Sequence, residues 1–180
     1  MATLVFGMMQ SLDGYVADTE GGLIAPPGPL LSQHFNDHVR TLAGCLYGRR
    51  MYEIMSYWDE DQPDWEAEEF AFANAWRSKP KWVVSRTLNS VGPNATLVNE
   101  DVEAFVRKLK AEVEGEIDVA GPELAGFLAN LGLIDEYHVY LRPFVLGGGK
   151  PFFASPIPAL RLFDTTQLGE EAIRLAYAPA

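Results

Sequence analysis

The sequence predicts an α/β protein with a mainly parallel sheet, because segments typical of strands and of helices alternate along most of the chain. Apolar runs at residues 3–10, 43–47 and 81–85 have the composition of buried strands, and stretches with helical spacing lie between them. Near the C-terminus, residues 159–167 and 171–178 have strand character with no helix between them. We therefore expect parallel strands covered by helices and finished by an antiparallel pair.

Four helices are expected between the strands. Ser32 is the predicted N-cap of the first, which runs to Leu42, and a second follows the acidic segment 59–69. The third begins at Asp101, and its apolar stripe consists of Val102, Phe105, Val106, Leu109 and Val113. The fourth spans 122–131, between a proline that suits a first helical turn and a glycine that suits a left-handed stop.

The composition is that of one ordinary globular domain. The chain has 180 residues, of which 48% are hydrophobic and 22% charged, so we expect residues 1–180 to form a single domain. Cys45 is the only cysteine, which excludes an internal disulfide and fits a reducing compartment. Residues 1–6 carry no basic leader, and no apolar run approaches membrane-spanning length. These features predict a cytoplasmic protein.

The net charge limits the possible partners. A formal charge of −11 disfavours nucleic acid and anionic membranes, because binding to both depends on a positive field. A small-molecule substrate is the expected partner. An anionic ligand would need a local cluster of basic residues.

Two segments that immediately follow predicted strands carry such basic residues. In the first, Gly48 lets a ligand approach the backbone, and Arg49 and Arg50 can bind phosphate oxygens with two hydrogen bonds each. In the second, Ser85 and Arg86 place a hydroxyl group beside a guanidinium group. Taken singly, each pair also fits a solvated strand end.

A third such segment follows the predicted strand 116–120. There Gly121 opens a helix whose free N–H groups form an anion site, although the same residues also fit an ordinary turn. Because the carboxyl ends of parallel strands meet at one edge of a sheet, the three segments together favour a nucleotide with several phosphates. A further strand is expected at 136–145, and the triple glycine at 147–149 is interpreted as a bend.

Five segments in order along the chain carry a resemblance to a known family. They are SLDGYVA (11–17), YGRRMYE (47–53), SRTL (85–88), GLIDE (132–136) and PFVLGGG (143–149). With them, the chain resembles the reductase domain of bacterial riboflavin biosynthesis and its stand-alone relatives, which are members of the dihydrofolate reductase-like superfamily. The resemblance extends over about residues 3–178.

The resemblance implies a dihydrofolate reductase-like three-layer sandwich, in which helices flank a mixed eight-stranded sheet and NADPH lies across the strand ends. It implies an NADPH-dependent oxidoreductase that transfers a hydride to a small planar nitrogen heterocycle, of pterin or diaminopyrimidine type, or to a related carbonyl compound. The alternative from another class is a non-catalytic ligand- or nucleotide-binding protein that kept this fold. Met51 and Trp58 filling the pocket beside the nicotinamide would favour that alternative.

The family motifs also imply which residues bind the cofactor. Met9, Val16 and Ala17 correspond to positions beside the nicotinamide, and Ser85 with Arg86 resembles the segment that holds the 2′-phosphate. The complete set of candidate cofactor-binding residues is Met9, Val16, Ala17, Gly48, Arg49, Arg50, Met51, Ser85, Arg86, Gly121, Glu123 and Leu124. In this set the backbone amides of Gly121, Glu123 and Leu124 are expected to meet the pyrophosphate.

Two carboxylates are candidate catalytic residues. Where dihydrofolate reductases carry a proton-donating carboxylate on the first helix, counting back from Gly48 leads to Ser32, and Asp37 lies about one turn further on. Asp37 is therefore one candidate, or an ordinary exposed helix residue. Asp13 is the other, or a residue that stabilises its own turn. The histidines are too dispersed for a recognisable metal pattern, so no metal is predicted.

Two expectations concern the surface. The glycine- and proline-rich segment 18–29 is predicted to form a lid or wall over the nicotinamide. A homodimer is predicted from the family and from the apolar side chains of Phe152, Phe153 and Phe163, which we expect to be exposed.

Overall fold

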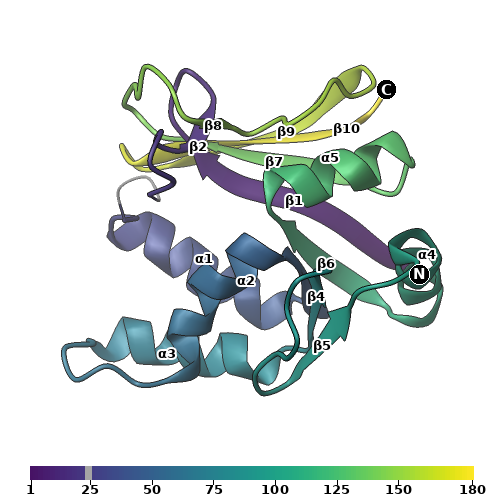
Figure 1. Ribbon diagram of the computed structural model, residues 1–180. Coiled ribbons are helices and arrows are strands. Elements are labelled where there is room, and N and C mark those ends of the chain that lie inside the picture. Colours follow the sequence, from purple (N-terminus) through teal and green to yellow (C-terminus); the bar gives the residue numbers. More distant parts are fainter. Residues whose placement is uncertain (23–25) are drawn as a thin grey trace.

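The chain folds around an eight-stranded sheet with the order β5-β4-β3-β6-β1-β7-β10-β9 (Figure 1). The computed structural model describes residues 1–22 and 26–180. The strands of this sheet are β1 (Ala2–Gln10), β3 (Gly44–Gly48), β4 (Lys81–Val84), β5 (Ala95–Val98), β6 (Gly115–Ala120), β7 (Glu136–Leu141), β9 (Leu160–Leu168) and β10 (Ala172–Pro179). From β5 to β7 neighbouring strands are parallel, whereas β10 is antiparallel to both β7 and β9. The predicted mixed sheet with a C-terminal antiparallel pair is confirmed.

Helices connect most of the parallel strands and cover both faces of the sheet. They are α1 (Pro29–Thr41), α2 (Arg49–Met55), the 3-10 helix η1 (Ser56–Asp59), α3 (Ala67–Ser78), α4 (Val102–Glu112) and α5 (Pro122–Asn130). Figure 1 shows α4 and α5 on one side of the sheet and α1, α2 and α3 on the other. Two short strands, β2 (Tyr15–Ala17) and β8 (Lys150–Pro151), pair outside the main sheet. No helix within the described residues is both long enough and apolar enough to cross a membrane.

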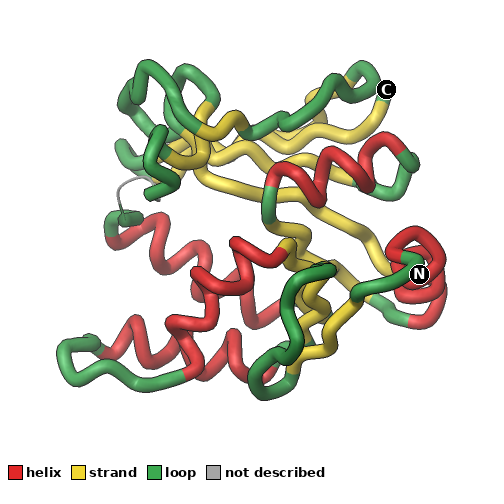
Figure 2. The backbone as a smooth tube through the Cα atoms, in the orientation of Figure 1, coloured by secondary structure: helices red, strands yellow, loops and turns green. Residues whose placement is uncertain are grey.

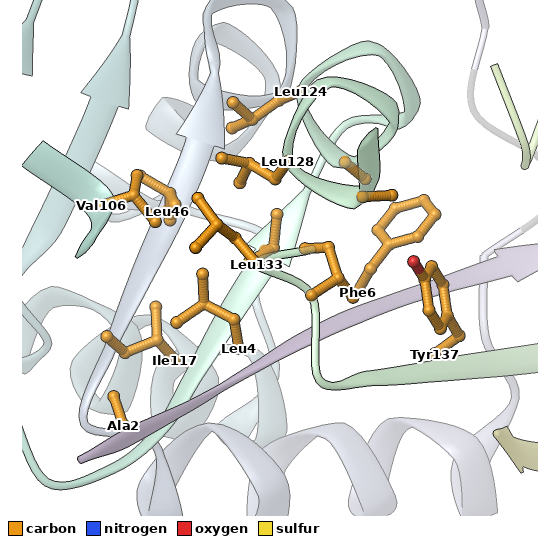
Figure 3. Packing of buried hydrophobic residues seen from close by; sticks show 14 of the residues in the cluster. Ala2, Leu4, Phe6, Leu46, Val106, Ile117, Leu124, Leu128, Leu133 and Tyr137 are labelled. Atoms are coloured by element: carbon orange, nitrogen blue, oxygen red, sulfur yellow. The ribbon is translucent and has the colours of Figure 1, made fainter. Parts of the chain in front are cut away.

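The face under α4 and α5 is a predominantly apolar core (Figure 3). Strand alternation points Leu4 and Phe6 of β1 toward this face, where they meet Ile117 of β6. Leu128 of α5 and Val106 of α4 are fully buried against them. Burial of each such side chain stabilises the fold by roughly 1.5–3 kcal/mol, which fixes the central strands and the helices behind them.

The opposite face combines apolar packing with buried polar groups. Trp76 of α3 is buried and donates a hydrogen bond from Nε1 to the Tyr47 hydroxyl of β3 at 3.0 Å. Lys81 is also buried, with Nζ 4.2 Å from the centre of the Trp76 ring and bonded to the carbonyl of Lys79. On this face the strands contribute polar side chains, and a cavity lies there.

The first helix begins earlier than its sequence predicts. Ser32 is not the N-cap, because α1 starts at Pro29 with Gly28 in the cap position. The carboxylate of Glu171 accepts hydrogen bonds from the amides of Leu30 and Leu31, both at 3.1 Å. A residue from the β9–β10 turn therefore caps α1 across the fold, so no local side chain is needed there.

Strand β5 was not predicted from the sequence. It is a short edge strand of residues 95–98, of which only Val98 is buried. Because an edge strand with one buried residue lacks an apolar alternation, its sequence resembles that of a loop.

Candidate functional site

A cavity of about 590 Å³ opens on the face of the sheet that carries α1, α2 and α3. Figure 2 shows these helices as red tubes on one side of the yellow sheet. Strands β1, β3, β6 and β7 form the floor, through residues such as Met9, Tyr47, Asp118 and Tyr140. Its size lies within the range of about 300–1,000 Å³ that small-molecule sites usually have.

Aromatic side chains form much of the cavity wall. Trp58 of η1 and Phe72 of α3 pack with ring centres 4.8 Å apart, and Phe35 of α1 packs against Tyr140 at 4.9 Å. Met51 also lines the space. Met51 and Trp58 therefore line a cavity rather than fill it.

Asp118 is the carboxyl group on the cavity floor. It lies on β6 between Val5 of β1 and Cys45 of β3, so its side chain points from the sheet toward the helices. No side chain or amide of the described residues donates a hydrogen bond to it. Burial raises its pKa to about 7, and the negative charge of Glu116 acts in the same direction against the opposing effect of His38. Asp118 can thus hold or release a proton near neutral pH.

His38 and Glu116 form a hydrogen-bonded pair beside Asp118. His38 Nε2 lies 2.7 Å from Glu116 Oε1. Burial alone would lower the pKa of His38, but the hydrogen bond and the charge of Glu116 outweigh it, so the pKa is raised. Burial alone would raise the pKa of Glu116, but the bond to His38 holds it below its ordinary value. The positive charge of His38 is therefore already matched by Glu116.

Asn36 of α1 contributes a second polar group to the wall. Its side chain is 7% exposed, and its amide nitrogen donates to the carbonyl of Glu68 at 3.4 Å. Its Oδ1 atom is buried and has no hydrogen-bond partner among the described residues. Asn36 therefore lines the cavity, while its amide oxygen is buried without a hydrogen-bond partner.

The starts of α2 and α5 lie side by side at the ends of β3 and β6. A Cβ atom on Gly48 would lie 3.7 Å from Leu124 Cβ, and one on Gly121 would lie 3.8 Å from the Gly48 amide nitrogen. Gly121 has φ of +111°, a conformation that favours glycine. Behind it, the amides of Glu123 and Leu124 have no acceptor within the described part of the chain. The two predicted strand-end segments are therefore adjacent and leave backbone donors free.

The arginines of this edge lie at the surface. Arg49 is exposed and forms an ion pair with Glu53 at 3.3 Å. Arg50 is exposed and lies near Glu123, whose pKa is lowered mainly by its bond to Lys150 at 2.8 Å and also by Arg50. Both arginines are therefore placed where a ligand outside the strand ends could reach them.

The serine and arginine after β4 occupy different surroundings. Ser85 is buried, and its Oγ accepts hydrogen bonds from the amides of Thr87 and Leu88 at 3.1 and 3.0 Å. Arg86 is exposed, with its side chain in solvent. Since β4 neighbours β3, Arg86 belongs to the same edge as Arg49.

The residues predicted beside the nicotinamide border the cavity. Met9 and Val16 line it, and Ala17 is buried next to Val16 on β2. Met9 Sδ accepts a hydrogen bond from the guanidinium of Arg142 at 3.4 Å. Of the predicted wall 18–29, residues 26 and 27 line the cavity, whereas residues 23–25 lie outside the described residues.

The two predicted catalytic carboxylates are not among the residues lining the cavity. Asp37 is exposed on α1 and pairs with Arg40 at 2.9 Å. The exposed carboxylate of Asp13 accepts hydrogen bonds from the amides of Leu146 and Gly147 at 3.1 and 2.7 Å. Its pKa is lowered by a hydrogen bond from Ser11 and by those two amides. In this structure Asp13 ties its turn to the 146–147 segment.

Sequence reasoning missed Asp118, Asn36 and His38. One signal could have found the first of them: Glu116 and Asp118 stand two residues apart in a strand that is otherwise apolar, so both point to one face. Polar residues repeated on one face of a central strand indicate a site. Within the described ranges, no group of three or more His, Cys, Asp or Glu side chains is arranged to hold a metal ion.

The mixed eight-stranded sheet, covered by helices on both faces and finished by an antiparallel pair, has the dihydrofolate reductase-like fold. RibD of Acinetobacter baumannii shares it with a TM-score of 0.75 and 18% identity, over 100% of this chain and 58% of that chain. The fold is also found in a Shewanella sp. PV-4 protein provisionally named for riboflavin biosynthesis, with a TM-score of 0.77 and 24% identity over 100% and 99% of the two chains.

This chain belongs to the RibD C-terminal domain family, whose sequence profile matches residues 2–173. The uncharacterized protein YyaP of Bacillus subtilis is 28% identical over 97% of this chain and 93% of its own length. YwjB of the same organism is 28% identical over 94% of both chains. The resemblance inferred from the five sequence segments is confirmed.

Proposed function

We propose that this protein is an NADPH-dependent reductase of a small planar nitrogen heterocycle or a related carbonyl compound. The observation that carries the proposal is the pair of adjacent glycine turns at Gly48 and Gly121, which leave backbone donors free beside a cavity of about 590 Å³. A dinucleotide needs both features, a strand-end cradle for its phosphates and an adjoining pocket for its reactive ring. The cofactor would supply the hydride.

The residues present fit such a cofactor. A side chain at Gly121 would occupy the space between the two helix starts, and its absence lets a phosphate approach the amides of Glu123 and Leu124. Arg49, Arg50 and Arg86 would provide positive charge at the same edge. The pairing of Glu123 with Lys150 offsets the one carboxylate at this helix start.

Within the cavity, the chain's own residues would position the substrate and hold a proton. Aromatic walls exclude water from the reacting atoms, as a hydride transfer requires. Reduction of a C=N or C=O bond also needs a proton on the nitrogen or oxygen. Asp118 is the group that would supply it, because its pKa of about 7 keeps part of it protonated at neutral pH.

A substrate screen tests the proposed activity. We expect NADPH oxidation, followed by absorbance, with at least one compound from a panel of pterins, diaminopyrimidines and flavins. The Thermotoga maritima relative is named a deaminase and 5-amino-6-(5-phosphoribosylamino)uracil reductase, so that pyrimidine belongs in the panel. Binding of a panel compound without any NADPH oxidation would instead support the non-catalytic alternative.

We expect the protein to bind NADPH at least tenfold more tightly than NADH. A bidentate arginine contact to the additional phosphate is worth on the order of 1.5–3 kcal/mol, which corresponds to a ten- to hundredfold change in affinity. Arg86→Ala and Arg49→Ala should each reduce this preference. Calorimetric titration of both cofactors against each protein measures it.

Arg107→Ala is the matched control for these two variants. Arg107 is exposed on α4 and pairs with Glu103 at 2.8 Å, on the other side of the sheet from the cavity. It should leave the preference unchanged. Equal affinities of the unmodified protein for NADPH and NADH would contradict the assignment.

We also propose that the protein is a homodimer. Phe163 and Leu162 of the edge strand β9 are 45% and 49% exposed, and Ile173 of β10 is 44% exposed. Phe153 is exposed as predicted, but Phe152 is not, because it packs against Phe6 with ring centres 4.4 Å apart. Sedimentation should find a particle of twice 19.9 kDa at micromolar protein, and a purely monomeric particle would contradict the proposal.

A further inference from the structure

Residues 26–28 form a part of the cavity wall that has no regular structure of its own. Pro26 and Pro27 line the cavity, and α1 begins directly after Gly28. Residues 26–28, here called the wall segment, belong to neither a helix nor a strand. The position of the wall segment therefore depends on contacts with other parts of the fold.

The first of these contacts comes from Glu171, in the turn between β9 and β10. Its Oε1 and Oε2 atoms accept hydrogen bonds from the amides of Leu30 and Leu31, each at 3.1 Å. The first amides of a helix have no acceptor within the helix itself, and a negative charge at this end is favourable. Glu171 therefore fixes the start of α1, to which the wall segment is joined.

The turn and the wall segment also pack without space for a further side chain. A Cβ atom on Gly28 would lie 2.6 Å from Glu171 Cδ and 2.7 and 2.8 Å from its two carboxylate oxygens. Gly28 has φ of −79°, which any residue can adopt, so glycine is required here for space and not for its backbone freedom. A larger residue at 28 would displace the carboxylate from the amides that it binds.

The second contact comes from Arg142, which directly follows β7. Its guanidinium donates hydrogen bonds to the carbonyls of Pro26 and Glu171, at 3.3 and 3.1 Å, and to Met9 Sδ at 3.4 Å. Arg142 is only 8% exposed. One buried side chain thus joins the wall segment, the β9–β10 turn and a residue of the cavity floor.

A merely space-filling role does not explain an arginine at this place. Burying a charged group costs free energy, and an apolar side chain of similar volume often stabilises a protein as well or better. A planar guanidinium, however, can donate to acceptors in several directions, which an apolar side chain or a lysine cannot do. The acceptors of Arg142 belong to the three segments that must meet at this edge of the cavity.

From these contacts we infer that Glu171 and Arg142 are positioning residues, which hold the wall segment where the nicotinamide half of NADPH requires it. The inference rests on the proposed function for the identity of the ligand. Neither residue is among those that line the cavity in the described part of the chain. If the wall segment is released, only the molecules that have it in place can bind, and the apparent affinity falls by that fraction.

Calorimetry with two nucleotides tests the inference. NADPH carries the nicotinamide half, whereas adenosine 2′,5′-bisphosphate lacks it and keeps the 2′-phosphate. We expect Glu171→Ala to weaken NADPH binding about tenfold and to change bisphosphate binding by less than about twofold. A general loss of structure would weaken the binding of both nucleotides.

Two further variants and one control assign the effect to the contacts. Gly28→Ala should displace the Glu171 carboxylate and weaken NADPH binding although no charge is removed. Arg142→Lys keeps the charge but cannot reach three acceptors, so it should weaken NADPH binding about threefold or more. Glu170→Ala removes a charge from an exposed position of the same turn and should have no effect. Circular dichroism of each variant verifies that it is folded.

Hydrogen exchange provides a measurement that needs no ligand. The amides of Leu30 and Leu31 donate to Glu171, so their exchange, followed by NMR, reports whether the start of α1 is held. We expect exchange about tenfold faster in Glu171→Ala and in Gly28→Ala, and unchanged in Glu170→Ala.

Three results would overturn the inference. They are unchanged NADPH affinity in folded Glu171→Ala, equal weakening of NADPH and bisphosphate binding, and unchanged exchange of the Leu30 and Leu31 amides. A failure of the proposed function gives a different result. The unmodified protein would then bind neither nucleotide, while exchange of the two amides still responded to Glu171→Ala and Gly28→Ala as expected.

Discussion

Asp118→Asn is expected to stabilise the protein at pH 8 by about 2–4 kcal/mol and to change its stability little at pH 4. Burial raises the pKa of Asp118 from an ordinary value of 3.8 to about 7. Each pKa unit corresponds to about 1.4 kcal/mol, so three units give about 4 kcal/mol, and contact with cavity water reduces this.

The direction of the pH dependence follows from proton counting. Between pH 4 and 7 the folded protein keeps a proton on Asp118 that the unfolded chain has lost, so rising pH favours unfolding. The loss of folding stability caused by ionisation of Asp118 reaches its full value above pH 7. Asparagine does not titrate in this range. The stability of Asp118→Asn relative to the wild type should therefore increase from pH 4 to pH 7.

Urea unfolding of the wild type and the variant at several pH values measures the difference. Glu112→Gln, at an exposed position on α4, is the control and should show no difference that grows with pH. A constant difference between Asp118→Asn and wild type from pH 4 to 8 would show that the carboxyl titrates normally.

Gly149→Ala is expected to destabilise the fold by about 2–4 kcal/mol, because it strains the backbone and produces a clash. Gly149 has φ of +141°, and an added Cβ would lie 2.0 Å from the Ala17 carbonyl oxygen. The clash would separate β8 from β2, where the cavity residue Val16 lies. Weaker binding of cavity ligands should accompany the loss of stability.

The neighbouring glycine gives a matched control. A Cβ on Gly148 would meet Thr19 Cγ2 at 3.8 Å, which is an ordinary contact, so Gly148→Ala should cost less than about 1 kcal/mol. Chemical denaturation of both variants measures the two effects. Equal losses of stability would mean that the close approach to β2 is not what requires glycine at 149.

The sequence by itself determined the order and type of most elements. The strand β1 and the helix α4 can be recognised from local patterns alone. Strands and helices have different periods, and each element must turn its apolar side toward the core. The sequence also predicted that Gly48 and Gly121 lie at one edge of the sheet, since parallel connections bring those strand ends together. The structure adds that the two strands, β3 and β6, are neighbours.

The tertiary structure decided what local patterns cannot encode. Asn36 and Asp118 are 82 positions apart in the numbering, and only the packing of α1 on the sheet brings them to one cavity. The same holds for the capping of α1 by Glu171, which replaced the local cap predicted at Ser32. Sequence patterns report the burial of each segment, whereas pairing of polar groups depends on which segments meet in space. The raised pKa of Asp118 also depends on tertiary packing. The residues that bury its carboxyl group and the charges beside it come from β1, β3 and α1 as well as from its own strand.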